Sequence, residues 1–319
     1  MQGGCDVFCV GNSVADVLAR PVDHLAPSGT SQPLDDVLLA AGGNSFNTAV
    51  ALARLGVRVR VATAVGDDNF GHFLREQLRA EGIEDSGMIT LAGGKTSTSI
   101  VLVEASGERR FLHLRGVGRL LSGEHIDWRQ VEGARVFHCA SVFALPRFDE
   151  TALAPALERA REMGCLTSVN ICWDVHGHWM KVLQPALAYT DFIFPNRAEG
   201  QQLTGESEPA GIAARLRELG AKTVVVKLGA AGCYIESAEG SFTAPGFPVQ
   251  PVDTTGAGDC FAAGFLAAIC RGRSLAEAAR YANAVGAMVT LNLGAADSAP
   301  RSEEVEGFLR RDSTPKGTS

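Results

Sequence analysis

The sequence predicts an α/β fold with a mostly parallel central sheet, helices on both faces of that sheet, and a small antiparallel β lid. Short β-branched runs alternate with helical patterns through most of the chain, which is typical of parallel sheets. Two segments interrupt this alternation and have strand-like patterns instead. The chain has 319 residues, enough for one large α/β domain or two modest ones.

The alternating elements can be placed along the chain in order. Strands are expected at 6–10, 57–65, 136–138, 167–171, 192–194, 223–227 and 232–235. Helices are expected at 45–55, 70–81, 151–163, 210–219, 258–270 and 275–291. In a parallel sheet of this kind, ligands bind beyond the carboxyl ends of the strands. The candidate site residues are therefore sought where these strands end.

The two interrupting segments, 15–40 and 95–118, form the predicted lid. Strand-like alternation at 98–103 and 110–114 flanks a turn at 104–108, which indicates a hairpin. An edge hairpin packed on the core is the alternative. A projecting sheet near strand ends would exclude water from the reaction. The remaining expected boundaries are an α/β core of 1–14, 41–94 and 119–310, which would contain the ligand-binding strand ends, and a disordered tail of 311–319.

Composition excludes several classes of protein. Hydrophobic residues make up 46% of the chain and charged residues 20%, as in ordinary globular proteins. The net charge of −7 provides no electrostatic footprint for nucleic acid or an anionic membrane. The eight cysteines form no C-x-x-C pair and lie mostly among apolar residues, so we expect reduced thiols. With no signal peptide or membrane span visible, a cytoplasmic location is expected.

The segment 253–261 provides the strongest chemical signal. Gly256, Ala257 and Gly258 leave backbone N–H groups bare at the start of an apolar helix, a natural cradle for a phosphate or a developing anion. Asp259 lies within this cradle, where a carboxylate would oppose a resting phosphate unless it accepts a proton from the attacking nucleophile. The alternative is a helix-capping Asp. The dinucleotide fingerprint is excluded because Phe261 replaces its third glycine.

A second polar cluster lies at 42–47. Gly42 and Gly43 let the backbone approach a small polyol, while Asn44 and Asn47 offer both donors and acceptors to hydroxyl groups. For Asn44 the alternative is an N-cap on the helix that follows. We therefore predict a sugar-binding turn here.

Two motifs together resemble a known family. The segments 41–56 and 65–71 are similar to the N-terminal signature of the ribokinase-like (PfkB) family of carbohydrate kinases. The segment 253–261 resembles the C-terminal signature of the same family. The two lie about 200 residues apart in the family's order, and the resemblance covers roughly residues 5–310. It implies a ribokinase-like fold and an ATP-dependent phosphotransferase.

The resemblance also implies roles for residues outside these signatures. Asn196 and Glu199 match an N-x-x-E motif that places Mg²⁺ and the nucleotide phosphates, although Glu199 could equally be a solvated helix charge. Asp16 matches a residue that binds sugar hydroxyls. Lys227, Gly229, Gly232 and Asn283 match segments that border the nucleotide. A further set of residues matches a possible K⁺ site: Asp253, Thr255 and Ser298.

The acceptor stays open at this stage. Arg115, at the end of the lid, could pair with a sugar carboxylate, but Asn170 stands where many sugar-acid kinases of the family have Asp. Ribose, fructose and 2-keto-3-deoxygluconate are all compatible acceptors. A nucleoside kinase and a non-catalytic ligand-binding homologue are the alternatives. His176 and His178 are expected to be loop residues, and His138 a core histidine. The lid edges predict a homodimer.

Overall fold

The computed structural model describes residues 4–312 and contains a nine-stranded, mostly parallel sheet. Its strand order is β13-β12-β11-β10-β9-β8-β1-β4-β5, and only β12 and β13 run antiparallel to their neighbours. The bounds, in sheet order, are β13 Gly240–Ala244, β12 Cys233–Ser237, β11 Thr223–Lys227, β10 Phe192–Phe194, β9 Leu166–Ile171, β8 Val136–Val142, β1 Val7–Val10, β4 Val59–Gly66 and β5 Met88–Leu91.

Both faces of this sheet are buried, as strand β1 shows. Val7 and Cys9 pack into one hydrophobic core, whereas Phe8 and Val10 pack into a second core on the opposite face. Successive side chains of a strand point to opposite faces, so a strand covered on both sides needs a continuous apolar run. This explains why the core strands could be located from short apolar runs.

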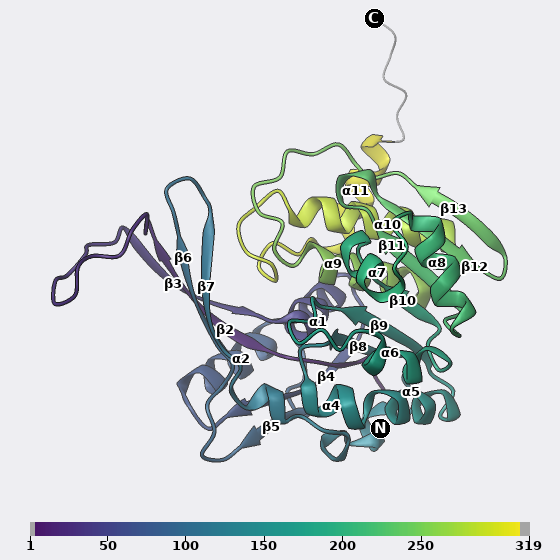
Figure 1. Cartoon of the computed structure of the whole chain (residues 1–319), viewed down its shortest axis with the longest axis horizontal. Helices are drawn as coiled ribbons and strands as arrows, with labels where there is room; N and C mark the ends of the chain where they lie inside the picture. Colours follow the sequence, from purple (N-terminus) through teal and green to yellow (C-terminus); the bar gives the residue numbers. More distant parts are fainter. Residues whose placement is uncertain (1–3, 313–319) are drawn as a thin grey trace, which may run out of the picture.

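Two groups of helices cover these faces (Figure 1). One face carries α1 (Asn44–Arg54), α2 (Asn69–Ala80), α9 (Ala257–Cys270), α10 (Leu275–Val289) and α11 (Ser302–Asp312). The other carries α3 (Trp128–Val131), α4 (Pro146–Thr151), α5 (Leu153–Glu162), α6 (Met180–Leu187), α7 (Arg197–Thr204) and α8 (Pro209–Glu218). The predicted three-layer α/β arrangement is confirmed.

The element predictions were right in the core and weaker at its margins. Strands β10 and β11 have the predicted bounds. The helix predicted at 151–163 is confirmed as α5, although it begins two residues later because Ala152, at φ −127°, leaves the helical region. The short helix α4 before it was not predicted. The outer strands β5 and β13 were not predicted. Each has only four or five residues and an exposed position in its pattern.

The small sheet is separate from the core sheet and projects from it (Figure 1). Its order is β3-β2-β6-β7, with β3 at Asp36–Gly42, β2 at Val14–Arg20, β6 at Thr98–Val103 and β7 at Arg109–Leu114. The alternative of an edge hairpin on the core sheet is therefore wrong. The sheet is mixed rather than wholly antiparallel, because β2 and β6 pair in parallel. The chain passes through the core between these two strands, and parallel pairing needs such a crossover.

The end of the chain extends the helical layer. Helix α11 includes Arg311 and Asp312, so the first two residues of the predicted tail are helical. The rest of the predicted tail, 313–319, lies outside the described residues. Across residues 4–312 we find no helix with the length and apolar character needed to cross a membrane.

Candidate active site

Asp259 lies in the first turn of α9 and is held by three amide side chains. Asn44 and Asn170 each donate to Oδ1 over 3.0 Å, and Asn47 donates to Oδ2 over 3.0 Å. The three donors come from the start of α1 and from β9, far from Asp259 in sequence. Asp259 itself is only 6% exposed. The fold thus encloses one carboxylate in a ring of hydrogen-bond donors.

This environment suits a proton acceptor. Burial raises the pKa of Asp259, while the three amides and the nearby Lys227 ammonium act in the opposite direction. Burial makes the carboxylate more basic, and the donors fix its orientation toward an incoming hydroxyl. The N-cap alternative for Asn44 is wrong, because Gly43 is the N-cap of α1 and the Asn44 side chain binds Asp259.

The turn before Asp259 is built around a glycine that no other residue could replace without strain. Gly256 has φ +73°, and a Cβ placed there would lie 2.3 Å from Cβ of Ala295. Ala257 begins α9, and its N–H donates to the carbonyl oxygen of Thr254 over 3.2 Å. The N–H groups of Gly258 and Asp259 follow it in the first turn, where the donors of a helix have no acceptor within the helix. Lys227 Nζ lies 3.2 Å from the position of a Cβ on Gly258. The turn therefore presents N–H donors and one ammonium to an anion.

The predicted sugar-binding residues meet where the small sheet joins α1. A Cβ on Gly42 would lie 2.6 Å from Oδ2 of Asp16, so only glycine allows this approach. Gly43 has φ +92° and directs the chain into α1. Burial raises the pKa of Asp16, opposed by the Ser99 hydroxyl. Asn47 Oδ1 is buried and has no partner among the described residues, which leaves an acceptor near Asp259.

The predicted nucleotide-binding residues line one cavity of about 540 Å³ next to this turn. Its lining includes the predicted residues Lys227, Gly229, Gly232 and Asn283, together with Ala257 and Gly258 of the turn. Asn283 donates to the carbonyl oxygens of Ala244 and Pro245 and so holds the cavity wall. Because the cavity opens on the start of α9, a ligand there would place an anionic group on the turn.

Asn196 and Glu199 cap the start of α7. Asn196 Oδ1 accepts from the Glu199 N–H over 2.8 Å, and Glu199 Oε2 accepts from the Asn196 N–H over 2.7 Å. Glu199 is 5% exposed, so it is not a solvated helix charge. Burial raises its pKa, and Lys227 acts in the opposite direction. Residues 4–312 contain no group of three or more His, Cys, Asp or Glu that could hold a metal by itself.

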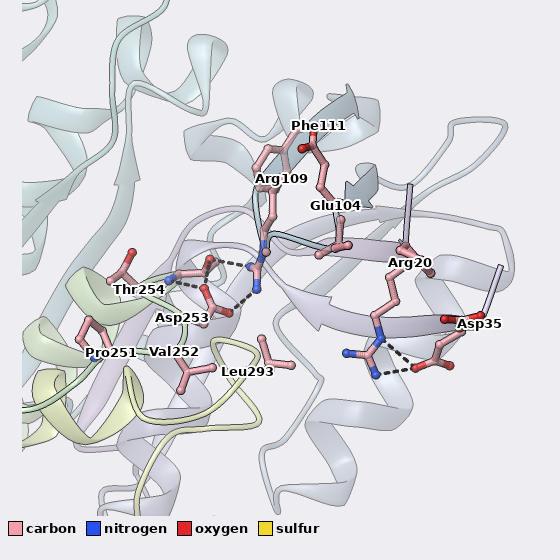
Figure 2. A pocket seen from close by; sticks show the side chains of 16 residues that line it. Arg20, Asp35, Glu104, Arg109, Phe111, Pro251, Val252, Asp253, Thr254 and Leu293 are labelled. Carbon is pink, nitrogen blue, oxygen red and sulfur yellow. Dashed lines mark hydrogen bonds and ion pairs between the residues drawn. The ribbon is translucent and has the colours of Figure 1, made fainter. Parts of the chain in front are cut away.

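The three residues predicted as K⁺ ligands already have hydrogen-bond partners within the protein. Asp253 accepts from Thr255 and from Arg109 of β7, across a cleft of about 1040 Å³ (Figure 2). The Ser298 hydroxyl donates to the carbonyl oxygen of Leu293 over 2.9 Å. Asp253 and Thr255 therefore lie together, and their polar atoms are already paired.

Arg115 lies apart from this network. Its Nη1 is 2.9 Å from Nε2 of His176, and within residues 4–312 no hydrogen bond or ion pair joins it to Asp16 or Asp259. His176 and His178 stack on each other in the loop before α6. His138 is fully buried, with Nδ1 2.9 Å from Oγ of Ser168, as expected of a core histidine.

Two participants were not predicted from the sequence. Asn170 was considered only as a departure from sugar-acid kinases, yet it bridges Asp259 and Lys227, whose Nζ donates to Asn170 Oδ1 over 2.9 Å. Its position at the carboxyl end of a predicted strand was the available signal. Arg109 stands in the polar run Gly107-Glu108-Arg109-Arg110, and nothing in that run distinguishes it from a solvated charge.

The family follows from the comparisons with known proteins. The model of the pfkB family carbohydrate kinases matches residues 5–302, and the chain belongs to this family. It is a sugar kinase with the ribokinase-like fold. It is 32% identical to fructokinase-1 of Zea mays over 86% of this chain and 90% of the relative. It is 33% identical to the ATP-dependent ribose-1-phosphate kinase of Halopiger xanaduensis over 95% of this chain and 97% of the relative.

Solved structures agree with this assignment. The ribokinase of Thermotoga maritima superposes with a TM-score of 0.82 at 28% identity, over 96% of this chain and 99% of the other. A provisionally named ribokinase II of E. coli, in complex with ATP and Mg²⁺, gives a TM-score of 0.84 at 26% identity. The match covers 96% of this chain and 99% of the other. Homologous structures thus hold both ATP and Mg²⁺.

Proposed function

We propose that this kinase transfers the γ-phosphoryl group of ATP to a primary hydroxyl of a small sugar, with Asp259 as the general base. The observation that carries this proposal is the buried Asp259 carboxylate, held by three amides at the start of α9. The attacking hydroxyl gives its proton to Asp259 while its oxygen bonds to phosphorus and the ADP oxygen leaves. The N–H groups of Gly256, Ala257 and Gly258 stabilise the charge on the transferred group.

ATP fits the cavity beside the turn. A volume of about 540 Å³ lies in the range of small-molecule sites, and its opening on the start of α9 directs the triphosphate to the N–H donors. Lys227 would contact the phosphates, and the wall held by Asn283 would border the base. The E. coli structure with ATP and Mg²⁺ supports the choice of donor.

Mg²⁺ fits a site shared between Glu199 and the nucleotide. Mg²⁺ usually keeps several waters and binds one or two carboxylates together with substrate phosphates, so a single buried carboxylate suits it. Glu199 uses Oε2 in the capping interaction with Asn196, which leaves Oε1 for the ion or its water. When bound, the ion would neutralise charge on the nucleotide phosphates.

The acceptor would lie between Asp16 and Asp259. Asp16, Asn44 and Asn47 offer the mixed donors and acceptors that sugar hydroxyls need. The names of the relatives direct attention to fructose, ribose and ribose 1-phosphate. Arg115 directly follows β7 of the small sheet, and we propose that it binds an acidic group on the acceptor where the acceptor has one. A 2-keto-3-deoxygluconate-like acid would use it.

A nucleoside is the second candidate acceptor, favoured by one observation. Phe111 is 58% exposed on the face of the small sheet that carries Asp16. It lies on β7, level with Leu18, which is two residues after Asp16 on β2. Paired residues on neighbouring strands share a face, so Phe111 could stack on a base whose ribose reaches Asp16.

An ADP-release assay tests these proposals. ATP and Mg²⁺ would be supplied with fructose, ribose, ribose 1-phosphate, 2-keto-3-deoxygluconate, adenosine or inosine, and Asp259→Asn would be run beside the wild type. Turnover of one sugar that the variant loses would support the proposal. Turnover of a nucleoside alone would select the second candidate. Equal turnover by wild type and variant would contradict the role of Asp259.

We also propose a homodimer formed through the outer face of the small sheet. The central row of this face consists of Val17, Leu39, Ile100 and Leu112, which are paired across the four strands. Three of these side chains are between 44% and 59% exposed. A contiguous apolar face on a sheet with open edges is a typical interaction surface.

A cytoplasmic location remains our proposal, supported by the cysteines. All eight are free thiols, as expected from the sequence, and seven of them are buried. Proteins of oxidising compartments commonly form disulfides, and those of reducing compartments do not. Fractionation of the native source, with detection by antibody, would test the location.

A further inference from the structure

The ion pair between Arg109 and Asp253 differs from the other ion pairs of the small sheet. Arg109 Nη2 lies 2.9 Å from Asp253 Oδ2, and the two side chains are 17% and 5% exposed. The neighbouring pairs Arg110–Glu104 and Arg20–Asp36 each include a side chain at least 43% exposed. Exposed pairs contribute little to stability, whereas removing one partner of a buried pair leaves a costly unpaired charge.

Asp253 has no acceptor capacity left. Its Oδ1 accepts from the N–H and the hydroxyl of Thr255 over 3.0 and 2.7 Å. Its Oδ2 accepts from Arg109 and from the N–H of Gly294, over 2.9 and 3.0 Å. A carboxylate has about four lone-pair sites, and all four are used here. A further cation could bind this carboxylate only by displacing Arg109.

The same carboxylate joins three segments that meet at the anion-binding turn. Thr255 begins the turn, Gly294 belongs to the loop whose Ala295 packs against Gly256, and Arg109 comes from β7 of the small sheet. Arg109 also donates from Nη1 to the Thr255 hydroxyl over 3.0 Å (Figure 2). The guanidinium therefore contacts the turn directly as well as through Asp253.

The charge of Arg109 matters because of where Asp253 lies. This carboxylate precedes by three residues a turn that has to receive a phosphoryl anion. Burial would raise the pKa of Asp253, but hydrogen bonds from Thr255, Gly294 and Arg109 outweigh burial and lower it, so the carboxylate stays charged. Without a cation beside it, that charge would oppose the incoming phosphate.

We propose that Arg109 is the resident cation of the anion-binding turn, in the place where the family resemblance predicts K⁺. Arg109 is then a positioning residue: it neutralises Asp253 and orders Thr255, and turnover does not need a monovalent metal ion. Because Arg109 belongs to β7, the turn is ordered only when the small sheet lies against the core. The position of the small sheet thus controls the order of the anion-binding turn through one side chain.

The test compares wild type, Arg109→Ala and Arg109→Lys in K⁺ and in tetramethylammonium at equal ionic strength. We expect wild-type kcat/KM and melting temperature to be the same in both salts. Arg109→Ala should lose activity by about 10-fold in tetramethylammonium, mainly in kcat, and regain it with K⁺ or with low guanidinium. In tetramethylammonium its melting temperature should be lower than that of the wild type, and adding K⁺ should raise it. Arg110→Ala, on the same strand, should match the wild type in both salts.

Two results would overturn the inference. One is a wild-type protein whose activity or melting temperature rises with K⁺. The other is Arg109→Ala that matches the wild type in tetramethylammonium. If Arg109→Ala does not fold, Arg109→Lys, which keeps the charge but not the two-donor geometry, carries the same salt comparison. The turnover measurement rests on the proposed phosphoryl transfer, whereas the melting measurement needs no substrate. Failure of the proposed function can therefore be distinguished from failure of the proposed role of Arg109.

Discussion

The core sheet and the small sheet bury their residues in opposite ways. Strand β8 of the core is buried at all seven positions, whereas β7 of the small sheet has no buried position. The core strands serve as a rigid support, with Asn170 and Lys227 at their carboxyl ends. The small sheet instead has two partly exposed faces. One carries Asp16 and Arg109, and the other carries the apolar row of Val17, Leu39, Ile100 and Leu112. From this difference we propose that the core holds the phosphoryl chemistry and that the small sheet selects and encloses the acceptor.

The largest effect is expected from the core carboxylate. Asp259→Asn should reduce kcat by roughly 10²–10⁴-fold, because the hydroxyl loses its proton acceptor. ATP affinity, measured by calorimetry, should change little, since the side chain faces the three amides rather than the cavity. A variant with normal turnover would place the base elsewhere and remove the main reason for assigning chemistry to the core.

A backbone change in the anion-binding turn should be nearly as damaging. Gly256→Ala introduces a Cβ 2.3 Å from Cβ of Ala295 at φ +73°, which should displace the turn and reduce kcat by about 10²-fold. Gly272→Ala is the matched control, because Gly272 also has φ +73° but has open space around it. The control should lose only roughly 1–2 kcal/mol of stability and keep its activity. Equal kinetics for both variants would argue against the role of the turn.

The outer face of the small sheet can be tested independently of catalysis. Leu112→Glu should convert the dimer to a monomer, because it places a charge in the central apolar row of both protomers. Leu25→Glu is the control, since Leu25 is 70% exposed, compared with 59% for Leu112, and lies outside the strands. Size-exclusion chromatography with light scattering gives the masses. A wild-type monomer, or a Leu112→Glu dimer, would exclude this interface.

The effect that bears least on catalysis is the pH dependence of stability, which involves His138 on the core strand β8. Burial, followed by the charge of Lys227, lowers the pKa of His138 to about 3. The unfolded chain binds this proton near pH 6.5, so the folded protein should lose stability as pH falls from about 6.5 toward 3. His138 contributes at most about 1.4 kcal/mol per pH unit to this slope.

Urea unfolding at several pH values checks this expectation. His138→Asn, which keeps a hydrogen-bonding partner for Ser168, should show a shallower loss of stability on acidification. The exposed His24→Asn should keep the wild-type slope. An unchanged slope in His138→Asn would mean that other groups control the acid response of the core.

The parts predicted from sequence are those with local signals. The strands β10 and β11 have uninterrupted apolar runs, and the turn at Gly256 has a fixed spacing to Asp259, so both could be located. The parts missed depend on distant contacts. Asn170 lies 89 residues from Asp259, and Arg109 lies 144 residues from Asp253. Neither residue has a sequence neighbour that reveals its partner, because only the folded chain brings each pair together.

Phosphorus NMR of the complete reaction tests the central claim most directly. Wild-type protein would be incubated with ATP, Mg²⁺ and the acceptor found in the panel, and Asp259→Asn would be treated in the same way. The account predicts a phosphomonoester resonance that grows with that of ADP in the wild type and is absent in the variant. Inorganic phosphate as the only product, or the same ester formed at the same rate by Asp259→Asn, would contradict it.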